Sequence, residues 1–239
     1  MKTDNNIGDT ANASNTIRML PDELLAAGVW VFDLDNTLYP ASSRLFDQVD
    51  WNMTDFVSNL LRLPKDEARL LQKQYFHEFG TTMRGLMTRH DVDPKVFLEY
   101  VHNIDLAPIS ADPGLIQALE KLPGRKVIFT NGSTAHAENI TRHIGIDHHF
   151  EGCFDIIDAG YVPKPAPDTY DAFCRRFDID PTEAVMVEDM AKNLVPAAGL
   201  GMTTVWLDTG VGWSRETSDD GHVHHRINDL ADWLTGITQ

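Results

Sequence analysis

Two carboxylates come directly after an apolar, strand-forming stretch in the segment VFDLDNTLYP at residues 31–40. Asp33 and Asp35 are separated by a single residue, so both lie at the edge of a core. Two like charges in such a place are unfavourable unless a cation lies between them. Carboxylate oxygens are the ligands that magnesium prefers, together with a phosphate of the substrate. The spacing therefore predicts a magnesium ion and a phosphate beside these two acids.

Further polar residues follow other apolar runs of the chain. A run at 126–130 leads into a threonine, an asparagine and a glycine, and a run at 184–189 ends in two acids. Ligands of open α/β sheets bind beyond the carboxyl ends of the strands, so these side chains should meet at one edge. Glu188 could bind the metal, accept a hydrogen bond from Lys164 or play a structural role. The residues concerned are Thr130, Asn131, Gly132, Lys164, Glu188 and Asp189.

These residue types suit the transfer of a phosphoryl group. Asp33 could bind the metal through one oxygen and attack phosphorus with the other, with Asp189 as a further ligand. Asp35 could offer its backbone carbonyl to the metal and its side chain as acid and base. Thr130 and the N–H groups of the residues that follow it stand where a helix begins, which is a natural cradle for an anion. Lys164 supplies a fixed positive charge for the phosphoryl group.

Apolar runs alternate with helical patterns along most of the chain. The runs are continuous rather than alternating in polarity, which is typical of parallel strands covered on both faces. The pattern predicts an α/β fold built on a doubly wound parallel sheet. The predicted strands span 28–33, 126–130, 153–160, 184–189 and 203–208.

One long interval breaks this alternation. Between about residue 43 and residue 110 the pattern is helical throughout, with no candidate strand. We expect a small all-helical cap domain at 44–110, inserted into an α/β core domain formed by 23–43 and 111–239. Residues 1–22 are polar at their start and are expected to form a flexible tail.

Composition limits the partners of this chain. Its formal net charge of −16 repels nucleic-acid polymers and anionic membranes. No apolar run approaches the length that spans a bilayer, and the N-terminus lacks the apolar region of a secretory signal. Cys153 and Cys174 suggest neither a disulfide framework nor a zinc site. We expect a cytoplasmic protein that binds a small phosphate compound, and the sequence does not indicate its oligomeric state.

A histidine-rich stretch, HVHH, lies near the C-terminus at 222–225. Histidines at close spacing can bind a metal ion, but no acidic or cysteine partner stands at ligand spacing here. We therefore expect His222, His224 and His225 to be surface residues without a role in the site.

Four segments in order, DLDNTLYP, FTNGS, KPAPDTY and VEDMAKNL, resemble the four motifs of the haloacid dehalogenase-like (HAD) hydrolase superfamily. The resemblance extends from about residue 28 to about residue 210 and implies a Rossmann-like core with a helical insertion after the first strand. It also implies that Asp33 is a nucleophile that becomes phosphorylated and that Asp35 is the general acid and base. Mg²⁺ would be held by Asp33, the Asp35 carbonyl and Asp189, with Glu188 nearby. Thr130 and Lys164 would bind the phosphate.

The cap segment QYFHEFGTTMRGL, residues 74–86, resembles the corresponding segment of the pyrimidine 5′-nucleotidase subfamily. This second resemblance implies hydrolysis of nucleoside monophosphates such as UMP and CMP. It places Tyr75, Phe79 and Arg84 as substrate contacts in the cap, although an aromatic stripe at helical spacing is also typical of a core. The chain departs from the subfamily at Phe79 and Met83, and Met190 stands where a serine is common.

Other functions are compatible with the same motifs. The core motifs do not separate a nucleotidase from a phosphatase or phosphomutase for a sugar phosphate or for phosphoglycolate. A dehalogenase is disfavoured because it needs neither a metal nor Asp35 as acid and base. A non-catalytic protein that binds a phosphate ligand is a third possibility. Such a protein would have no reason to keep all five of Asp33, Asp35, Thr130, Lys164 and Asp189.

Overall fold

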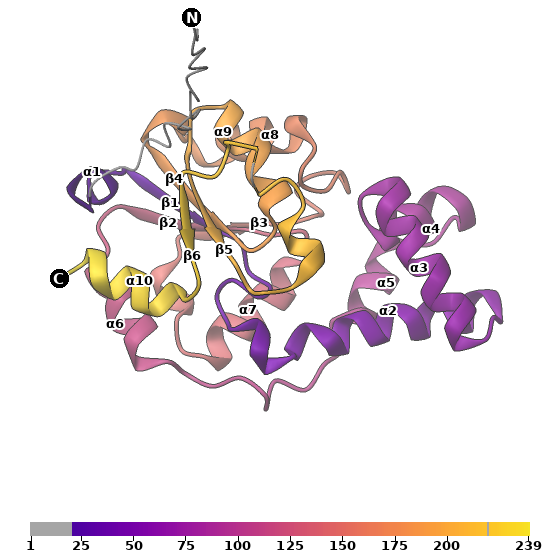
Figure 1. The fold of residues 1–239 in the computed structure, drawn as a ribbon. Coiled ribbons are helices and arrows are strands. Elements are labelled where there is room, and N and C mark those ends of the chain that lie inside the picture. The colour runs from indigo at the N-terminus through magenta and orange to yellow at the C-terminus, as the bar shows by residue number, and fades with distance from the viewer. Residues whose placement is uncertain (1–20, 219) are drawn as a thin grey trace, which may run out of the picture.

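A six-stranded parallel sheet forms the centre of the molecule, with the strand order β3-β2-β1-β4-β5-β6. The computed structural model describes residues 21–218 and 220–239. β1 lies in the middle of the sheet and pairs with β2 and β4, so its end is surrounded by other strand ends (Figure 1). The strands are β1 Val29–Phe32, β2 Arg125–Phe129, β3 Gly152–Phe154, β4 Ala184–Glu188, β5 Thr203–Leu207 and β6 His225–Ile227.

Helices cover both faces of this sheet, as the continuous apolar runs predict (Figure 1). Alternate side chains of β1 enter different cores: Trp30 and Phe32 pack with one layer of helices, and Val31 packs with the other. Full burial of a side chain such as Phe32 contributes about 1.5–3 kcal/mol to folding. The first layer holds α1 Pro21–Leu25, α6 Pro113–Lys121, α7 Thr134–His143 and α10 Leu230–Ile237, and the second holds α8 Pro167–Phe177 and α9 Leu194–Gly199.

Four of the helices between β1 and β2 in the chain stand to one side of the sheet (Figure 1). They are α2 Leu45–Leu61, α3 Lys65–Phe79, α4 Thr82–His90 and α5 Pro94–Val101. Their buried side chains form a third apolar cluster. Gly80 ends α3 with a φ of 85°, a left-handed conformation in which glycine has no Cβ to clash. The interval 43–110 thus contains helices and turns only, as predicted, and its treatment as a separate cap domain stays a prediction.

Three short elements differ from the sequence prediction. The run 153–160 forms a strand only as far as Phe154, because Asp155 then accepts hydrogen bonds from the N–H groups of Ile157 and Asp158 and turns the chain. β6 was not predicted, since its three residues include a histidine and an arginine and carry no apolar run. α1 begins at Pro21, so the last two residues of the predicted tail are helical and the rest lie outside the described residues.

The expectation of surface histidines near the C-terminus is wrong for His222 and His225. His222 and His225 are buried, and His222 Nε2 lies 2.8 Å from the carbonyl oxygen of Ala191. His224 Nδ1 accepts a hydrogen bond of 2.9 Å from the N–H of Thr204 on β5. The imidazoles of His222 and His224 thus connect the chain before β6 to its neighbours. Among the described residues, no helix is both long and apolar enough to cross a membrane.

Candidate active site

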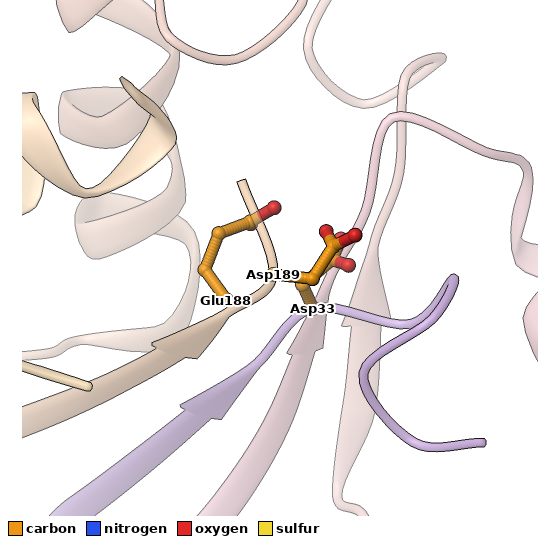
Figure 2. A group of neighbouring side chains, drawn as sticks. All are labelled: Asp33, Glu188 and Asp189. Carbon is orange, nitrogen blue, oxygen red and sulfur yellow. The ribbon is translucent and has the colours of Figure 1, made fainter. Parts of the chain in front are cut away.

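The ends of β1 and β4 place three carboxylates together. Asp33 follows β1, Glu188 is the last residue of β4 and Asp189 follows it, and one ligand atom of each lies within 4.8 Å of the others. The three side chains project from neighbouring strand ends toward a common space (Figure 2). A hydrogen bond of 3.0 Å from the Asp33 N–H to the Val187 carbonyl continues the sheet and fixes the position of Asp33. The predicted convergence at the carboxyl edge of the sheet is what the structure shows.

Lys164 is the cation that faces these acids. Its ammonium lies 2.8 Å from Asp33 Oδ1, 2.7 Å from Glu188 Oε2 and 2.7 Å from the Phe129 carbonyl oxygen, and the residue is 2% exposed. Asn131 holds the Lys164 backbone in place, since its Oδ1 accepts from the Lys164 N–H at 2.8 Å and its Nδ2 donates to the Lys164 carbonyl at 3.3 Å. The side chain of Asn131 therefore supports the lysine loop.

Glu188 is held at both oxygens. Its Oε2 accepts from Lys164, and its Oε1 accepts from Asn193 Nδ2 at 3.0 Å. Of the three roles that the sequence left open, this arrangement favours an acceptor that positions Lys164, although the same carboxylate also lies close enough to Asp33 and Asp189 to share a metal.

Negative charge is in excess at this edge. Burial, with the charge of Glu188, raises the pKa of Asp33 to about 7, although Lys164 acts in the opposite direction. Burial, with Glu188 and Asp33, raises the pKa of Asp189 well above its ordinary value. Burial opposes the charge of Lys164, but Asp33 and Glu188 more than offset this effect and raise its pKa. Three carboxylates face a single ammonium, and each carboxylate offers oxygen ligands. This arrangement fits a divalent cation such as Mg²⁺.

Asp35 has a different environment from Asp33. Its Oδ1 accepts hydrogen bonds from the Tyr39 hydroxyl at 2.7 Å and from His136 Nε2 at 2.9 Å. Burial alone would raise the pKa of Asp35, but the charge and hydrogen bond of His136, with the Tyr39 hydroxyl, lower it. The pKa values of the two neighbouring carboxyls are thus shifted in opposite directions: that of Asp33 is raised and that of Asp35 is lowered.

The segment expected to cradle an anion, residues 130–132, leads into α7. Thr130 is buried and its Oγ1 accepts the N–H of Gly132 at 2.9 Å, so that N–H points to Thr130. Ser133 is the helix cap, as its side chain accepts from the His136 N–H. Thr130, Asn131 and Gly132 all line the cavity described next.

A cavity of about 160 Å³ lies between the strand ends and the four inserted helices. Its floor holds the site residues named above, and its opposite wall is mainly apolar. That wall is made by Phe46, Val49, Asp50, Met53, Gln72, Lys73, Phe76, Thr81, Thr82, Met83, Phe97, Leu98, Val101 and His102.

The three cap residues expected to contact substrate do not line this cavity. Tyr75 packs on Gly85, where an added Cβ would lie 2.5 Å from the Tyr75 ring, and its hydroxyl lies 2.7 Å from His90 Nε2. Phe79 packs edge-on against Tyr75, and Arg84 lies in the first turn of α4. The face of α3 that meets the cavity carries Gln72, Lys73 and Phe76 instead, because one helical step of about 100° separates neighbouring residues.

A comparison with family models matches residues 29–201 to the haloacid dehalogenase-like hydrolases. The chain belongs to this family. The match covers β1 to β4 and the inserted helices, and it contains every residue of the site. The resemblance seen in the four sequence motifs is thereby confirmed at the level of the family.

Curated relatives of this HAD hydrolase include a phosphatase. The chain is 29% identical over 223 residues to "Glyceraldehyde 3-phosphate phosphatase" of Pyrococcus abyssi, covering 86% of this chain and 92% of that protein. It is 26% identical over 228 residues to "Phosphate metabolism protein 8" of Saccharomyces cerevisiae, covering 88% of this chain. The chain spans 65% of the length of that yeast protein.

Solved structures share the fold of this HAD hydrolase. A HAD phosphatase from Thermococcus onnurineus has a TM-score of 0.53 at 22% identity, covering 75% of this chain and 86% of its own. The L-2-haloacid dehalogenase of Xanthobacter autotrophicus, bound covalently to chloropropionic acid, has a TM-score of 0.54 at 15% identity, covering 87% of this chain and 97% of its own. The fold thus hosts different chemistries, and the site residues must decide between them.

Sequence reasoning missed three residues of this HAD hydrolase site. Tyr39 stands four residues after Asp35 in the first motif, so its position could have been suspected. His136 stands 101 residues from Asp35, and only the fold brings the two together. His102 comes from the end of α5 and stacks on His136.

Proposed function

We propose that this protein is a magnesium-dependent phosphomonoester hydrolase that works through an aspartyl-phosphate on Asp33. The observation that carries the proposal is the ion cluster at the cavity floor, where Asp33 contacts Lys164 and lies beside Asp189. A nucleophilic carboxylate, a fixed cation and a second metal-binding acid are the parts that phosphoryl transfer needs. The phosphatase among the curated relatives supports the same reaction class.

Asp33 and the positive charges around it carry out the transfer of the phosphoryl group. Asp33 attacks phosphorus, while Lys164 at 2.8 Å and the Thr37 hydroxyl at 3.2 Å hold one carboxylate oxygen each. Mg²⁺, held by Asp33, Asp189 and the Asp35 carbonyl, would supply positive charge that keeps Asp33 ionised and offsets charge on the phosphoryl group. Lys164 adds a second positive charge.

Asp35 handles the protons in both halves of the reaction. In the first half, its protonated carboxyl gives a proton to the oxygen of the departing alcohol. In the second half, the carboxylate takes a proton from the water that cleaves the phosphoaspartate. The inserted helices form the far wall of the cavity, so the leaving group meets their side chains.

For the substrate, we propose a pyrimidine nucleoside monophosphate such as UMP or CMP. The proposal rests on the resemblance of residues 74–86 to the pyrimidine 5′-nucleotidase cap. Phe46, Phe76 and Phe97 on the cavity wall support it, since aromatic side chains suit a flat base.

A small sugar phosphate or phosphoglycolate is the second candidate. The cavity of about 160 Å³ is smaller than the roughly 300–1,000 Å³ of pockets that hold drug-sized ligands, which favours a small leaving group. Curated relatives named for glyceraldehyde 3-phosphate and fructose 1-phosphate support this candidate too.

The test is phosphate release from a panel of phosphomonoesters with Mg²⁺, with chelator and with Asp33→Asn. The panel holds UMP, CMP, dUMP, AMP, GMP, phosphoglycolate, glyceraldehyde 3-phosphate and fructose 1-phosphate. A lead of tenfold or more in kcat/KM for UMP or CMP supports the nucleotidase. A leading sugar phosphate overturns it in favour of the second candidate, and metal-independent release overturns the reaction class.

A further inference from the structure

His136 is a buried imidazole that contacts the acid–base group of the site. It is 2% exposed, and its Nε2 lies 2.9 Å from Oδ1 of Asp35. The Tyr39 hydroxyl donates to the same oxygen at 2.7 Å. The other oxygen, Oδ2, faces Gly132 on the cavity floor, where a Cβ added to the glycine would lie 3.7 Å away. Two donors on one oxygen therefore leave the second oxygen turned toward the reacting groups.

The inserted helices contribute to this arrangement through His102, which follows the end of α5. The rings of His102 and His136 stack with centroids 4.0 Å apart and planes 10° apart. Burial, with the neighbouring His136, lowers the pKa of His102 to about 3, so the imidazole is neutral. Its Nδ1 lies 3.0 Å from the hydroxyl of Ser133, which can donate to it while also capping the His136 N–H. The cap side thus holds the His136 ring on its face.

We propose that His136 is a positioning residue that aims Oδ2 of Asp35 at the leaving group, and that His102 keeps His136 in place from the cap side. This inference rests on the proposed hydrolysis of a phosphomonoester. It adds a link between the inserted helices and proton transfer, because the stacked ring lies on a segment that begins in α5. The acid–base group would be fully ordered only when those helices rest on the core.

A poorly aimed general acid affects substrates unequally. An alkyl phosphate needs a proton on its leaving oxygen, whereas an aryl phosphate such as p-nitrophenyl phosphate leaves as a stable anion without one. The ratio kcat/KM includes the steps up to the departure of the leaving group, so it reports the acid role alone. A merely structural role of His136 would lower kcat/KM for both ester classes by the same factor.

The experiment measures kcat/KM for one alkyl and one aryl phosphate in His136→Leu and His136→Gln. His136→Leu should lose at least about tenfold on the alkyl ester and much less on the aryl ester. His136→Gln keeps an N–H donor and should recover most of the alkyl activity. His143→Leu, on the same helix but with its ring 3.1 Å from the Ile109 carbonyl, is the matched control and should leave the ratio unchanged.

The cap contact is tested with His102→Ala in the same assay. Its alkyl-to-aryl ratio should fall as in His136→Leu, and the double variant should be no worse than His136→Leu, because both changes act through one group. Equal losses on both esters, or additive effects in the double variant, would overturn the inference. If the wild type releases phosphate from neither ester, both the proposed function and the inference are overturned. If the wild type is active on both esters and the His136 variants leave the alkyl-to-aryl ratio of kcat/KM unchanged, only the inference is overturned.

Discussion

The ammonium of Lys164 lies 2.8 Å from the carboxylate of Asp33, although 131 residues separate them in the chain. Both groups are nearly inaccessible to solvent, with side-chain exposures of 1% and 9%. Removing two charges from water is unfavourable unless each is compensated. The pair is therefore the structural core of the site, and its neighbours Glu188 and Asp189 leave a local excess of negative charge.

Removing the Lys164 charge should destabilise the metal-free protein. Lys164→Met leaves buried carboxylates without their cation and should lower the free energy of unfolding by about 3–5 kcal/mol. The measurement is urea denaturation in chelator. Lys126→Met is the matched control, because the Lys126 ammonium donates to the Leu122 and Gly124 carbonyls and, among the described residues, forms no ion pair. Equal effects of the two changes would show that the acids near Lys164 are not compensated by it.

Magnesium should stabilise the folded protein without any substrate. A metal that binds the native state at a hundred times its Kd adds about 2.7 kcal/mol to the free energy of unfolding. We expect Tm to rise with Mg²⁺ in the wild type and to respond far less in Asp189→Asn. Asp147→Asn, an exposed aspartate outside the site, should behave as the wild type does. A metal response that survives in Asp189→Asn would place the ion elsewhere.

The metal-free protein should lose stability as the pH rises toward neutrality. Burial and Glu188 raise the pKa of Asp33 from 3.8 to about 7, so between these values the folded state holds a proton that the unfolded chain releases. The free energy of unfolding therefore falls from about pH 4 to about pH 7.

Asp33→Asn has no such titration, so its stability relative to the wild type should increase across this window. Urea denaturation in chelator at several pH values gives both curves. The assigned environment of Asp33 is contradicted if the free energy of unfolding of Asp33→Asn minus that of the wild type stays constant or falls as the pH rises.

We expect the Phe76 side chain to contact the leaving group of the substrate. Its ring lines the cavity, and the ring centroid lies 4.6 Å from the ammonium of Lys192. α3 and the segment that follows β4 therefore meet beside the site. Phe76→Ala should raise KM for the preferred substrate by roughly tenfold, since an aromatic contact with the substrate of about 1.5 kcal/mol is lost. Phe79→Leu, which does not line the cavity, is the control. A larger effect of Phe79→Leu in steady-state kinetics would restore the original expectation for the cap.

The sheet and the acids were predictable because they depend on local patterns. Four of the five predicted strands appear within a residue or so of their expected ends, and Asp33 and Asp189 follow strands whose apolar runs are unbroken. Parallel strands then bring those ends to one edge whatever the loops do. The third predicted strand was overextended, since the Asp155 side chain turns the chain where composition alone still favours a strand.

The cap contacts were less predictable because they depend on helix rotation and docking. Periodicity identified α3 but not the face it would present, so Tyr75 and Phe79 were chosen where Gln72, Lys73 and Phe76 meet the cavity. The partners of Asp35 were hidden for another reason. His136 lies on α7 and His102 after α5, and no local pattern connects either with the first motif.

The most direct test of the account is to trap the covalent intermediate on Asp33. In Asp35→Asn an aryl phosphate still loses its leaving group, but the base for the second step is missing, so the phosphoaspartate should accumulate. The protein is mixed with p-nitrophenyl phosphate and Mg²⁺, quenched in acid, digested and analysed by mass spectrometry. We predict a hydroxylamine-sensitive phosphoryl group on the peptide that contains Asp33. Release of p-nitrophenol with no phosphoryl group on that peptide, or with one on another residue, would contradict the account.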